Sequence, residues 1–319
     1  MKYYCTHFDI NYTGHALSLY HSLVKHAGEF KLFMFCMDDD SCMHLGKQYL
    51  NNAVLIPYEQ LENAIPNLIG AKFNRSRVEY FYTCSPATCY YVFQYFEEVD
   101  LLTYLDADLY FYSSPLPLFD ELGNESIGII EHRFHWFSRR NKIYGNFNVG
   151  WISFRKNENG LRCLNDWMQN CIKWCYQQLE DEKYADQKYL DAWPNEYHSV
   201  KILHNKGANL AIWNIGNYKL KISDQNVFVD NERLIFYHFA NLKQISENKF
   251  CSDLSRVFVP TNQIILEEIY VPYIHSLLRY QVKVIIPKND FYNNNIVFRI
   301  KKLSRDIRQL FFPDIINIV

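Results

Sequence analysis

The chain has 319 residues, with 33 Lys and Arg against 35 Asp and Glu, which gives a formal net charge of −2. This balance argues against a dedicated nucleic-acid-binding protein, because phosphate neutralisation needs a surplus of cations. Only 11 residues are glycine, and their spacing excludes both the G-x-G-x-x-G turn and the P-loop. A bound nucleotide diphosphate would therefore need another neutralising group, for which a metal ion is the obvious candidate.

The nine cysteines are odd in number, irregular in spacing and without a C-x-x-C pair. We expect them to be reduced and to pack as small hydrophobic residues in a cytoplasmic protein, rather than to form disulfides or a zinc site. The first 20 residues are interrupted by polar and charged side chains, so we expect no secretory or membrane-spanning segment.

Taken in chain order, the sequence predicts alternating strands and helices, which is the pattern of an α/β sheet. Ser85-Pro86 is expected to begin one of the helices, as N-cap and first helical residue. Another helix should bury Leu17, Tyr20 (or His21) and Val24 on one face. Strands are predicted over 2–6, 31–37, 53–56, 99–105, 127–131, 148–154 and 234–237, and helices around 17–24, 85–97, 161–174 and 264–284.

The character of the sequence changes from about residue 260. A polar, Asn-rich break covers 289–295, and the last segment is basic and amphipathic over 299–319. This segment could pack on its own domain or a partner, or could lie on an anionic membrane with Phe311 and Phe312 inserted. Its predicted apolar helical face is formed by Ile300, Leu303, Ile307, Leu310 and Phe311, and Arg299, Lys301, Lys302, Arg305 and Arg308 surround the other face.

The strongest candidate site is Asp106 and Asp108, two positions apart and directly after the apolar strand over 99–105. Ligands of α/β sheets bind at the carboxyl ends of such strands. Carboxylate oxygens suit Mg²⁺ or Mn²⁺, which can bridge a diphosphate and stabilise a departing nucleotide. The alternative is a solvated acidic loop, which the apolar strand before the pair makes less favoured.

The segment over 104–108, with Ser114-Pro115-Leu116 after it, resembles the metal-binding Asp-x-Asp region of GT-A glycosyltransferases. It is most similar to family 8 and to related bacterial nucleotide-diphospho-sugar transferases. Four more short motifs, over 4–12, 146–150, 185–190 and 236–239, follow in that family's order, so the resemblance covers roughly residues 1–245. It implies an α/β GT-A fold, a Rossmann-like mixed sheet flanked by helices, with a catalytic domain over 1–250 and a helical C-terminal extension over 251–319.

The same resemblance implies roles for individual residues. After His238 the chain departs from the family pattern, because Asn241 and Gln244 replace a glycine and a lysine and Lys243 lies one position early. The implied metal ligands are Asp106, Asp108 and His238; the implied contacts to the donor nucleotide and metal region are Thr6, Phe8, Tyr12, Arg77, Ala107 and Lys243; and the implied residues around the donor sugar are Asn148, Asp186 and Gln187.

Structural roles remain open for several of these residues. His238 could be a core histidine, and Asp186-Gln187 could cap a helix. Arg75 and Arg77 could form surface salt bridges instead of contacting the donor. The basic and aromatic stretch over 132–140 could be an acceptor-side loop or an ordinary exposed loop.

The resemblance leads us to expect metal-dependent transfer from a nucleoside-diphosphate sugar, with UDP as first choice, to a glycan or glycolipid in bacterial surface polysaccharide synthesis. The enzyme would act in the cytoplasm or at the inner membrane face. A retaining reaction, with Gln187 or Asp186 beneath the anomeric carbon, is slightly favoured; an inverting one would use Asp186 or Glu131 as base. A nucleotidyltransferase and a non-catalytic glycan-binding or scaffold protein remain alternatives.

Overall fold

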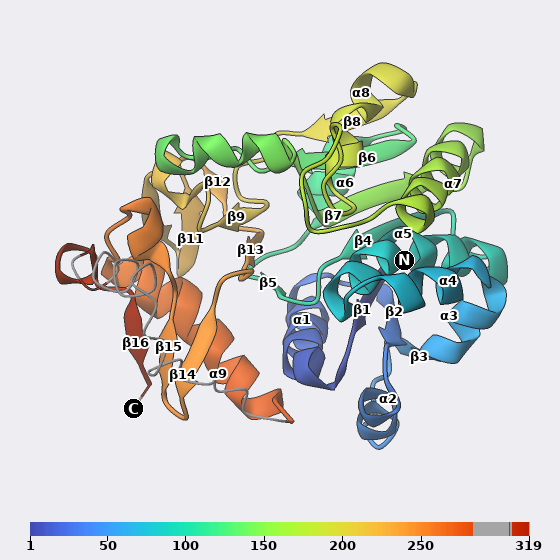
Figure 1. Cartoon of the computed structure of the whole chain (residues 1–319). Helices are drawn as coiled ribbons and strands as arrows, with labels where there is room; N and C mark the ends of the chain where they lie inside the picture. The colour runs from blue at the N-terminus through green and yellow to red at the C-terminus, as the bar shows by residue number, and fades with distance from the viewer. Residues whose placement is uncertain (283–305, 307, 319) are drawn as a thin grey trace, which may run out of the picture.

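The computed structural model describes residues 1–282, 306 and 308–318. Its largest feature is a seven-stranded mixed sheet with helices on both faces, at the right of Figure 1. The strand order is β3-β2-β1-β4-β7-β6-β8, and β7 runs antiparallel to both of its neighbours. The strands are β1 (Lys2–Phe8), β2 (Phe30–Cys36), β3 (Ala53–Pro57), β4 (Leu101–Leu105), β6 (Ile127–Glu131), β7 (Phe147–Arg155) and β8 (Val200–Leu203).

Side chains that alternate along the buried strands divide the core of this sheet into two layers. In β1, Tyr4 belongs to one hydrophobic cluster and its neighbour Cys5 to the other, as the two-residue period of a strand requires. The Tyr4 cluster is covered by α1 (Thr13–His26), α2 (Asp39–Leu45) and α6 (Leu116–Leu122). The Cys5 cluster is covered by α3 (Tyr58–Ala64), α4 (Asn67–Asn74), α5 (Arg77–Tyr95) and α7 (Glu158–Lys173).

Three small sheets and two consecutive helices form the left-hand part of the molecule in Figure 1. Their side chains make a third hydrophobic cluster, which extends from Leu210 to Ile316 and so joins residues from both sides of position 250. The sheets are β5 (Leu109–Phe111), β13 (Phe236–His238) and β9 (Leu210–Ala211); β10 (Leu220–Ser223), β11 (Asn226–Val229) and β12 (Glu232–Arg233); and β14 (Lys243–Ser246), β15 (Lys249–Cys251) and β16 (Ile315–Asn317). The helices are the π-helix η6 (Ile264–Tyr270) and α9 (Val271–Tyr280).

Short helical segments complete the described chain. Two of them border the candidate site: η1, which follows β1, and η2, the green helix at the upper left of Figure 1. The segments are η1 (Ile10–Tyr12), η2 (Trp136–Tyr144), η3 (Lys188–Asp191), α8 (Trp193–Glu196), η4 (Ile215–Asn217) and η5 (Leu254–Val257).

The structure contains all seven predicted strands, with ends within two residues of the predicted ones. The expected mixed α/β architecture is therefore confirmed. All nine cysteines are free thiols, as expected. Among the described residues, no helix combines the length and the apolar character needed to cross a membrane.

Two helix predictions need correction. Helix α5 begins at Arg77, because Ser76 forms a capping box with Glu79, and Ser85 and Pro86 lie buried inside the helix. Proline removes one helical hydrogen bond, but here a long buried helix face offsets that loss. In α1, Leu17 and Tyr20 are buried as predicted, whereas Val24 is 49% exposed because Leu19 and Leu23 complete the core-facing side.

The C-terminal region is anchored to the N-terminal sheet through α9 and α1. Nδ1 of His15 lies 2.6 Å from the hydroxyl of Tyr273, and the hydroxyls of Ser18 and Ser276 lie 2.9 Å apart. The predicted helix over 264–284 is present as η6 and α9 up to Tyr280. An unpredicted strand, β16, pairs with β15, so the last described residues return to the domain instead of leaving it.

Residues 299–305, 307 and 319 of the predicted basic amphipathic segment lie outside the described residues, as does the Asn-rich break over 289–295. Residues 308–311 are helical, and Phe311 is 74% exposed. The ring of Phe312 packs edge-on against Phe258, with 5.6 Å between centroids. Phe312 therefore contacts its own chain and is only partly exposed. The predicted boundary at residue 250 and the membrane contact stay predictions.

Candidate active site

Strand ends bring the Asp-x-Asp pair and His238 together. Asp106 and Asp108 lie in the tight turn that joins β4 to β5. Strand β13 pairs antiparallel with β5, and this register places His238 opposite Leu109, the residue after Asp108. His238 is thus brought to the acidic pair by a long-range strand pairing.

The three side chains form a compact ligand group. Nε2 of His238 lies 3.1 Å from Oδ1 of Asp108 and 3.6 Å from Oδ2 of Asp106. Their potential ligand atoms all lie within 4.8 Å of one another. Two carboxylates and one imidazole are a suitable donor set for Mn²⁺, and the imidazole nitrogen makes the set less suited to Mg²⁺, which prefers oxygen.

The electrostatics of this group favour a bound positive charge. Burial and the nearby Asp108 raise the pKa of Asp106 to about 6, although His238 acts in the opposite direction. Burial would also raise the pKa of Asp108, but the charge and hydrogen bond of His238 outweigh it and lower that pKa. Burial likewise opposes the charged form of His238, yet Asp108 outweighs it and raises the pKa of the imidazole. A proton on His238 and a metal ion would therefore satisfy the same two carboxylates, so metal binding should release a proton.

A chain of hydrogen bonds selects the tautomer of His238. Oδ1 of Asn148 accepts from the backbone N–H of Gly150 at 3.1 Å and lies 3.2 Å from Nδ1 of His238. The amide nitrogen of Asn148 lies 3.2 Å from Nε2 of His132, whose Nδ1 lies 3.1 Å from the carbonyl of Asn146. Burial lowers the pKa of His132 to about 3, so its Nε2 is an acceptor. In the consistent assignment, Nδ1–H of His238 donates to Asn148, which leaves the Nε2 lone pair directed at the acidic pair.

Gly150 makes this arrangement possible. A Cβ atom at position 150 would lie 2.7 Å from Oδ1 of Asn148 and 2.8 Å from Nδ1 of His238. A real Cβ atom essentially never lies this close to another heavy atom, so any larger residue must displace the imidazole or the amide. The glycine of the Asn-Val-Gly sequence thus provides the space in which His238 and Asn148 meet.

The ligand group borders a cavity of about 430 Å³, which we call the donor cavity after the role that the family resemblance predicts for its residues. It lies where several strands of the main sheet end, as expected for an α/β protein. All the residues that the sequence analysis assigned to the site line it except Thr6 and Lys243: Phe8, Tyr12, Arg77, Asp106, Ala107, Asp108, Asn148, Asp186, Gln187 and His238.

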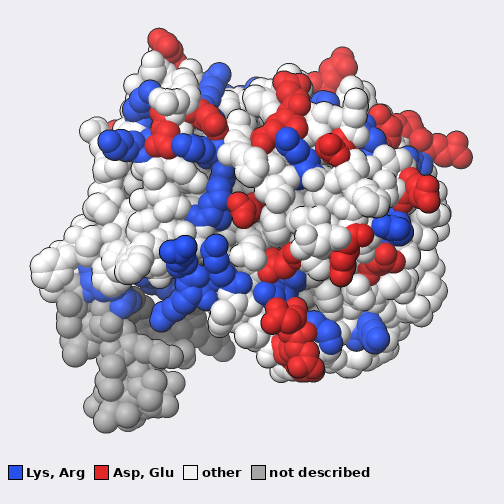
Figure 2. Space-filling view, turned by 90° about the horizontal axis from the view of Figure 1, so that it is seen from above, with Lys and Arg blue, Asp and Glu red and all other residues white. Residues whose placement is uncertain are grey.

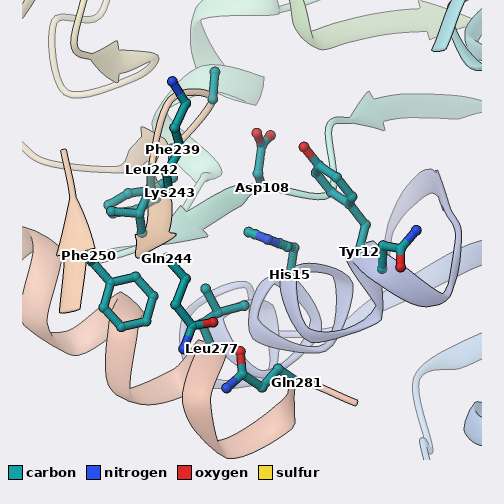
Figure 3. A pocket seen from close by; sticks show the side chains of 12 residues that line it. Tyr12, His15, Asp108, Phe239, Leu242, Lys243, Gln244, Phe250, Leu277 and Gln281 are labelled. Carbon is teal, nitrogen blue, oxygen red and sulfur yellow. The ribbon is translucent and has the colours of Figure 1, made fainter. Parts of the chain in front are cut away.

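Thr6 and Lys243 lie elsewhere. Thr6 is fully buried in β1 and does not reach the cavity surface. Lys243 lines a smaller adjacent hollow of about 200 Å³ together with Tyr12, His15 and Asp108 (Figure 3). Its ammonium group lies 3.5 Å from a carboxylate oxygen of Asp253, and the side chain is more than half exposed. Lys243 therefore approaches the acidic pair from the C-terminal side and already has an anionic neighbour.

Arg77 organises the loop that follows β1. One of its guanidinium nitrogens lies 2.8 Å from Asp9 and 2.9 Å from Asp38. Asp9 in turn accepts hydrogen bonds from the backbone N–H groups of Asn11 and Tyr12, which begins η1. Arg77 thus forms salt bridges, which was the structural alternative predicted for it, and its side chain also lines the donor cavity.

Asp186 lies nearly buried in the cavity wall. Its carboxylate accepts a hydrogen bond from the hydroxyl of Ser85 at 2.8 Å, and its backbone carbonyl accepts one from the indole of Trp167 at 2.8 Å. Burial raises the pKa of Asp186 to about 7, against the effect of Ser85 and with a smaller contribution from Asp106. Near neutral pH this side chain is therefore poised between its acid and carboxylate forms.

The Asp186→Asn variant is expected to flatten the pH dependence of stability. Between about pH 4, the usual pKa of an unfolded aspartate, and pH 7, the folded protein holds a proton on Asp186 that the unfolded chain has released. The stabilisation is complete below this window and is lost as the pH rises through it, by up to about 1.4 kcal/mol per pH unit. Urea unfolding of wild type and variant at pH 4.5 to 8 measures the difference. Equal slopes in the two proteins would show that Asp186 is not the titrating group.

Sequence reasoning missed several residues that support the site. The hydroxyl of Tyr104 donates to Oδ1 of Asp106 at 3.0 Å. Ser85 orients Asp186, and His132 orients Asn148, through the hydrogen bonds described above. Tyr104 directly precedes the acidic pair, so its place in the motif could have indicated it, but no local signal links Ser85 to Asp186. Glu131, the alternative base, lines a separate hollow with Arg133 and Arg139 and does not border the donor cavity.

No family model matches the chain. The Bacillus subtilis (strain 168) protein YfnD, described as uncharacterized, is 30% identical over 271 residues, covering 83% of this chain and 85% of YfnD. YfnF of the same organism, also described as uncharacterized, is 30% identical over 254 residues, covering 77% of this chain and 83% of YfnF.

Two solved structures share the fold. The crystal structure of the galactosyltransferase LgtC with donor and acceptor sugar analogues aligns with a TM-score of 0.55 and 13% identity, covering 89% of this chain and 97% of LgtC. The bifunctional glycosyltransferase WbbM aligns with a TM-score of 0.50 and 14% identity, covering 88% of this chain and 52% of WbbM. The fold expected from the motif order is thus confirmed, and the extended sequence identity places the chain in the family of YfnD and YfnF, with a GT-A glycosyltransferase fold.

Proposed function

We propose that the protein is a metal-dependent glycosyltransferase that moves a sugar from a nucleoside-diphosphate sugar, first of all a UDP-sugar, to a glycan or glycolipid. The observation that carries this proposal is the Asp106–Asp108–His238 group at the edge of a 430 Å³ cavity in a GT-A fold. LgtC is described as a galactosyltransferase, which supports the same reaction class here. The order of the five short motifs supports a relationship of this chain to glycosyltransferase family 8.

The ligand group fits the metal that such a reaction requires. The oxygens of Asp106 and Asp108 and Nε2 of His238 would hold Mn²⁺ in preference to Mg²⁺. When bound, the ion would neutralise the diphosphate as the nucleotide departs. Asn148 and His132 would keep the proton of the neutral imidazole on Nδ1 of His238, so that Nε2 is the nitrogen that binds the ion, and Tyr104 would fix one oxygen of Asp106.

The remaining cavity residues would bind the donor. Tyr12 is partly exposed beside the acidic pair and could stack on the base, with its loop fixed by Asp9 and Arg77. Asp186 and Gln187 line the same cavity and would lie beside the donor sugar. The proposed reaction retains the anomeric configuration, a preference that rests on the family resemblance. Cytoplasmic surface-polysaccharide synthesis is proposed on the same basis.

Nucleotidyl transfer is the less favoured enzyme class. It normally requires a third carboxylate near the acidic pair to hold a second metal ion. Among the described residues, the ligand group contains two carboxylates and one imidazole, without a third carboxylate at comparable distance. Pyrophosphate release from a nucleoside triphosphate would reverse this preference.

A thermal-shift experiment tests the proposal directly. Ligands that bind only the folded state raise its melting temperature by mass action. UDP and Mn²⁺ together are expected to raise it by more than the sum of their separate shifts, with smaller effects from GDP or CMP. UDP release from UDP-sugars, followed by NMR of the product's anomeric proton, then identifies the sugar and the stereochemistry. If no nucleoside diphosphate binds in the presence of Mn²⁺, the proposal is wrong.

A further inference from the structure

A second large hollow opens beside the donor cavity. Its volume is about 400 Å³, and we call it the η2 hollow because η2 contributes much of its wall. His132, Gln187 and Trp213 line both spaces, so a ligand in one would lie next to a ligand in the other. Gln187 is held at this boundary by a 2.9 Å hydrogen bond from its amide to the backbone carbonyl of Tyr144 in η2.

The two spaces carry opposite charge. The donor cavity is lined by four carboxylates, Asp9, Asp106, Asp108 and Asp186, and by one arginine, Arg77. The described lining of the η2 hollow contains two arginines, Arg140 and Arg256, and no carboxylate. Anions would therefore be attracted to the η2 hollow, whereas the donor cavity suits a cation together with a diphosphate.

The two arginines differ in how far they are already neutralised. Arg256 lies 3.1 Å from Asp253, so part of its charge is balanced. Arg140 is exposed and forms no ion pair with any residue in the described part of the chain. Its guanidinium is thus free to form paired hydrogen bonds with a carboxylate or phosphate.

The charge continues outward along η2. Arg139 and Lys142 line the next hollow, which also contains Arg133 and Glu131. Figure 2 views the molecule from the side on which η2 lies in Figure 1 and shows a band of Lys and Arg side chains across this face. The η2 hollow therefore adjoins a surface that is rich in Lys and Arg.

Aromatic rings supply the rest of the wall. The rings of Tyr144 and Tyr184 lie 4.6 Å apart, centroid to centroid, and Phe134 and Phe137 also border the space. Flat apolar faces with polar edges are suited to the faces of sugar rings. The wall therefore combines surfaces for a sugar with one free guanidinium.

We propose that the η2 hollow binds the acceptor and that this acceptor is an anionic glycan, whose carboxylate or phosphate is recognised by Arg140. This inference rests on the proposed transferase function and adds the chemical class of the acceptor. Arg256 adds a second positive charge near the same anionic group. Trp213 and Gln187 lie between the acceptor and the donor sugar. A neutral glycan would leave the guanidinium of Arg140 without a partner.

Three methyl glucosides that differ only at C6 test the inference: the neutral sugar, its 6-carboxylate (the glucuronide) and its 6-phosphate. Binding to the full chain is measured by ligand-observed NMR with UDP and diamagnetic Mg²⁺ present. The wild type is expected to bind at least one anionic sugar about 10-fold more tightly than the neutral one, since hydrogen bonds to charged groups are the stronger kind. The stronger of the two anionic probes identifies the charged group.

Arg140→Gln is expected to remove most of this preference, and Arg139→Gln provides the matched control. Both arginines are exposed and adjacent on η2, but Arg139 lines the other hollow, so its variant should keep the preference. Equal binding of neutral and anionic sugars by the wild type, or equal losses in the two variants, would overturn the inference. Failure of UDP to bind together with Mn²⁺ in the thermal-shift experiment would instead contradict the proposed function, so the two failures are distinguishable.

Discussion

Asp108→Asn is expected to lower the Mn²⁺-dependent turnover of the nucleotide-sugar donor by about 1,000-fold, which corresponds to about 4 kcal/mol of transition-state stabilisation. The substitution preserves shape but removes one of the two negative charges that face His238 at 3.1 and 3.6 Å. It should therefore weaken metal binding as well as turnover. Release of UDP from the donor measures turnover, and Mn²⁺ titration followed by electron paramagnetic resonance measures metal affinity.

The matched control for this experiment is Asp120→Asn, which removes a carboxylate from an exposed position on α6. Turnover and Mn²⁺ affinity should stay near the wild-type values in that variant. If Asp108→Asn retains full Mn²⁺-dependent turnover, the assignment of the metal site to the Asp106–Asp108–His238 group is wrong.

Gly150→Ala is expected to lower turnover by about 100-fold, because displacing a ligand side chain by about 1 Å can cost that much. The new methyl group would lie 2.7 Å from Oδ1 of Asn148 and 2.8 Å from Nδ1 of His238, both in a nearly closed environment. Overpacking at such a site should also reduce the free energy of unfolding by about 1–3 kcal/mol. UDP release and urea denaturation measure the two effects.

Gly70→Ala is the control for a glycine-to-alanine change. Position 70 lies inside α4, and outside its own helix turn and chain neighbours no described atom lies within 4 Å of the Cβ that would be added. Alanine favours a helix over glycine by up to about 1 kcal/mol, so this variant should be as stable as the wild type or slightly more stable. Unchanged activity in Gly150→Ala would show that the chain repacks around His238 without consequence for the site.

The strands could be predicted because each is encoded in a short stretch of sequence. Each of the seven predicted strands contains a largely apolar run of four or more residues. Such a run is buried almost regardless of which elements pack beside it. The start of α5 was missed for a local reason. Ser76 and Glu79 form the capping box, whereas Ser85-Pro86 carries a similar signal and lies inside the helix.

Other parts of the site depend on residues that are far apart in the chain. Ser85 and Asp186 come from different elements and meet only because α5 and the loop before η3 cover the same end of the sheet. Likewise, Lys243 was assigned to the donor by its position after His238, but the fold places it beside Asp253 in an adjacent hollow. Sequence spacing could not reveal either contact.

Composition opened the question of how a glycine-poor chain could bind a diphosphate. The sequence by itself determined the core of the proposed metal site: a buried strand followed by Asp106 and Asp108, because strand burial and carboxylate spacing are local properties. Only the tertiary structure decided which groups join that pair. The register of β13 against β5 places His238 beside the pair, the absence of a side chain at Gly150 leaves room for it, and the arginines around η2 give the adjacent hollow its positive charge. These are long-range contacts, set by how the whole chain buries its apolar surface.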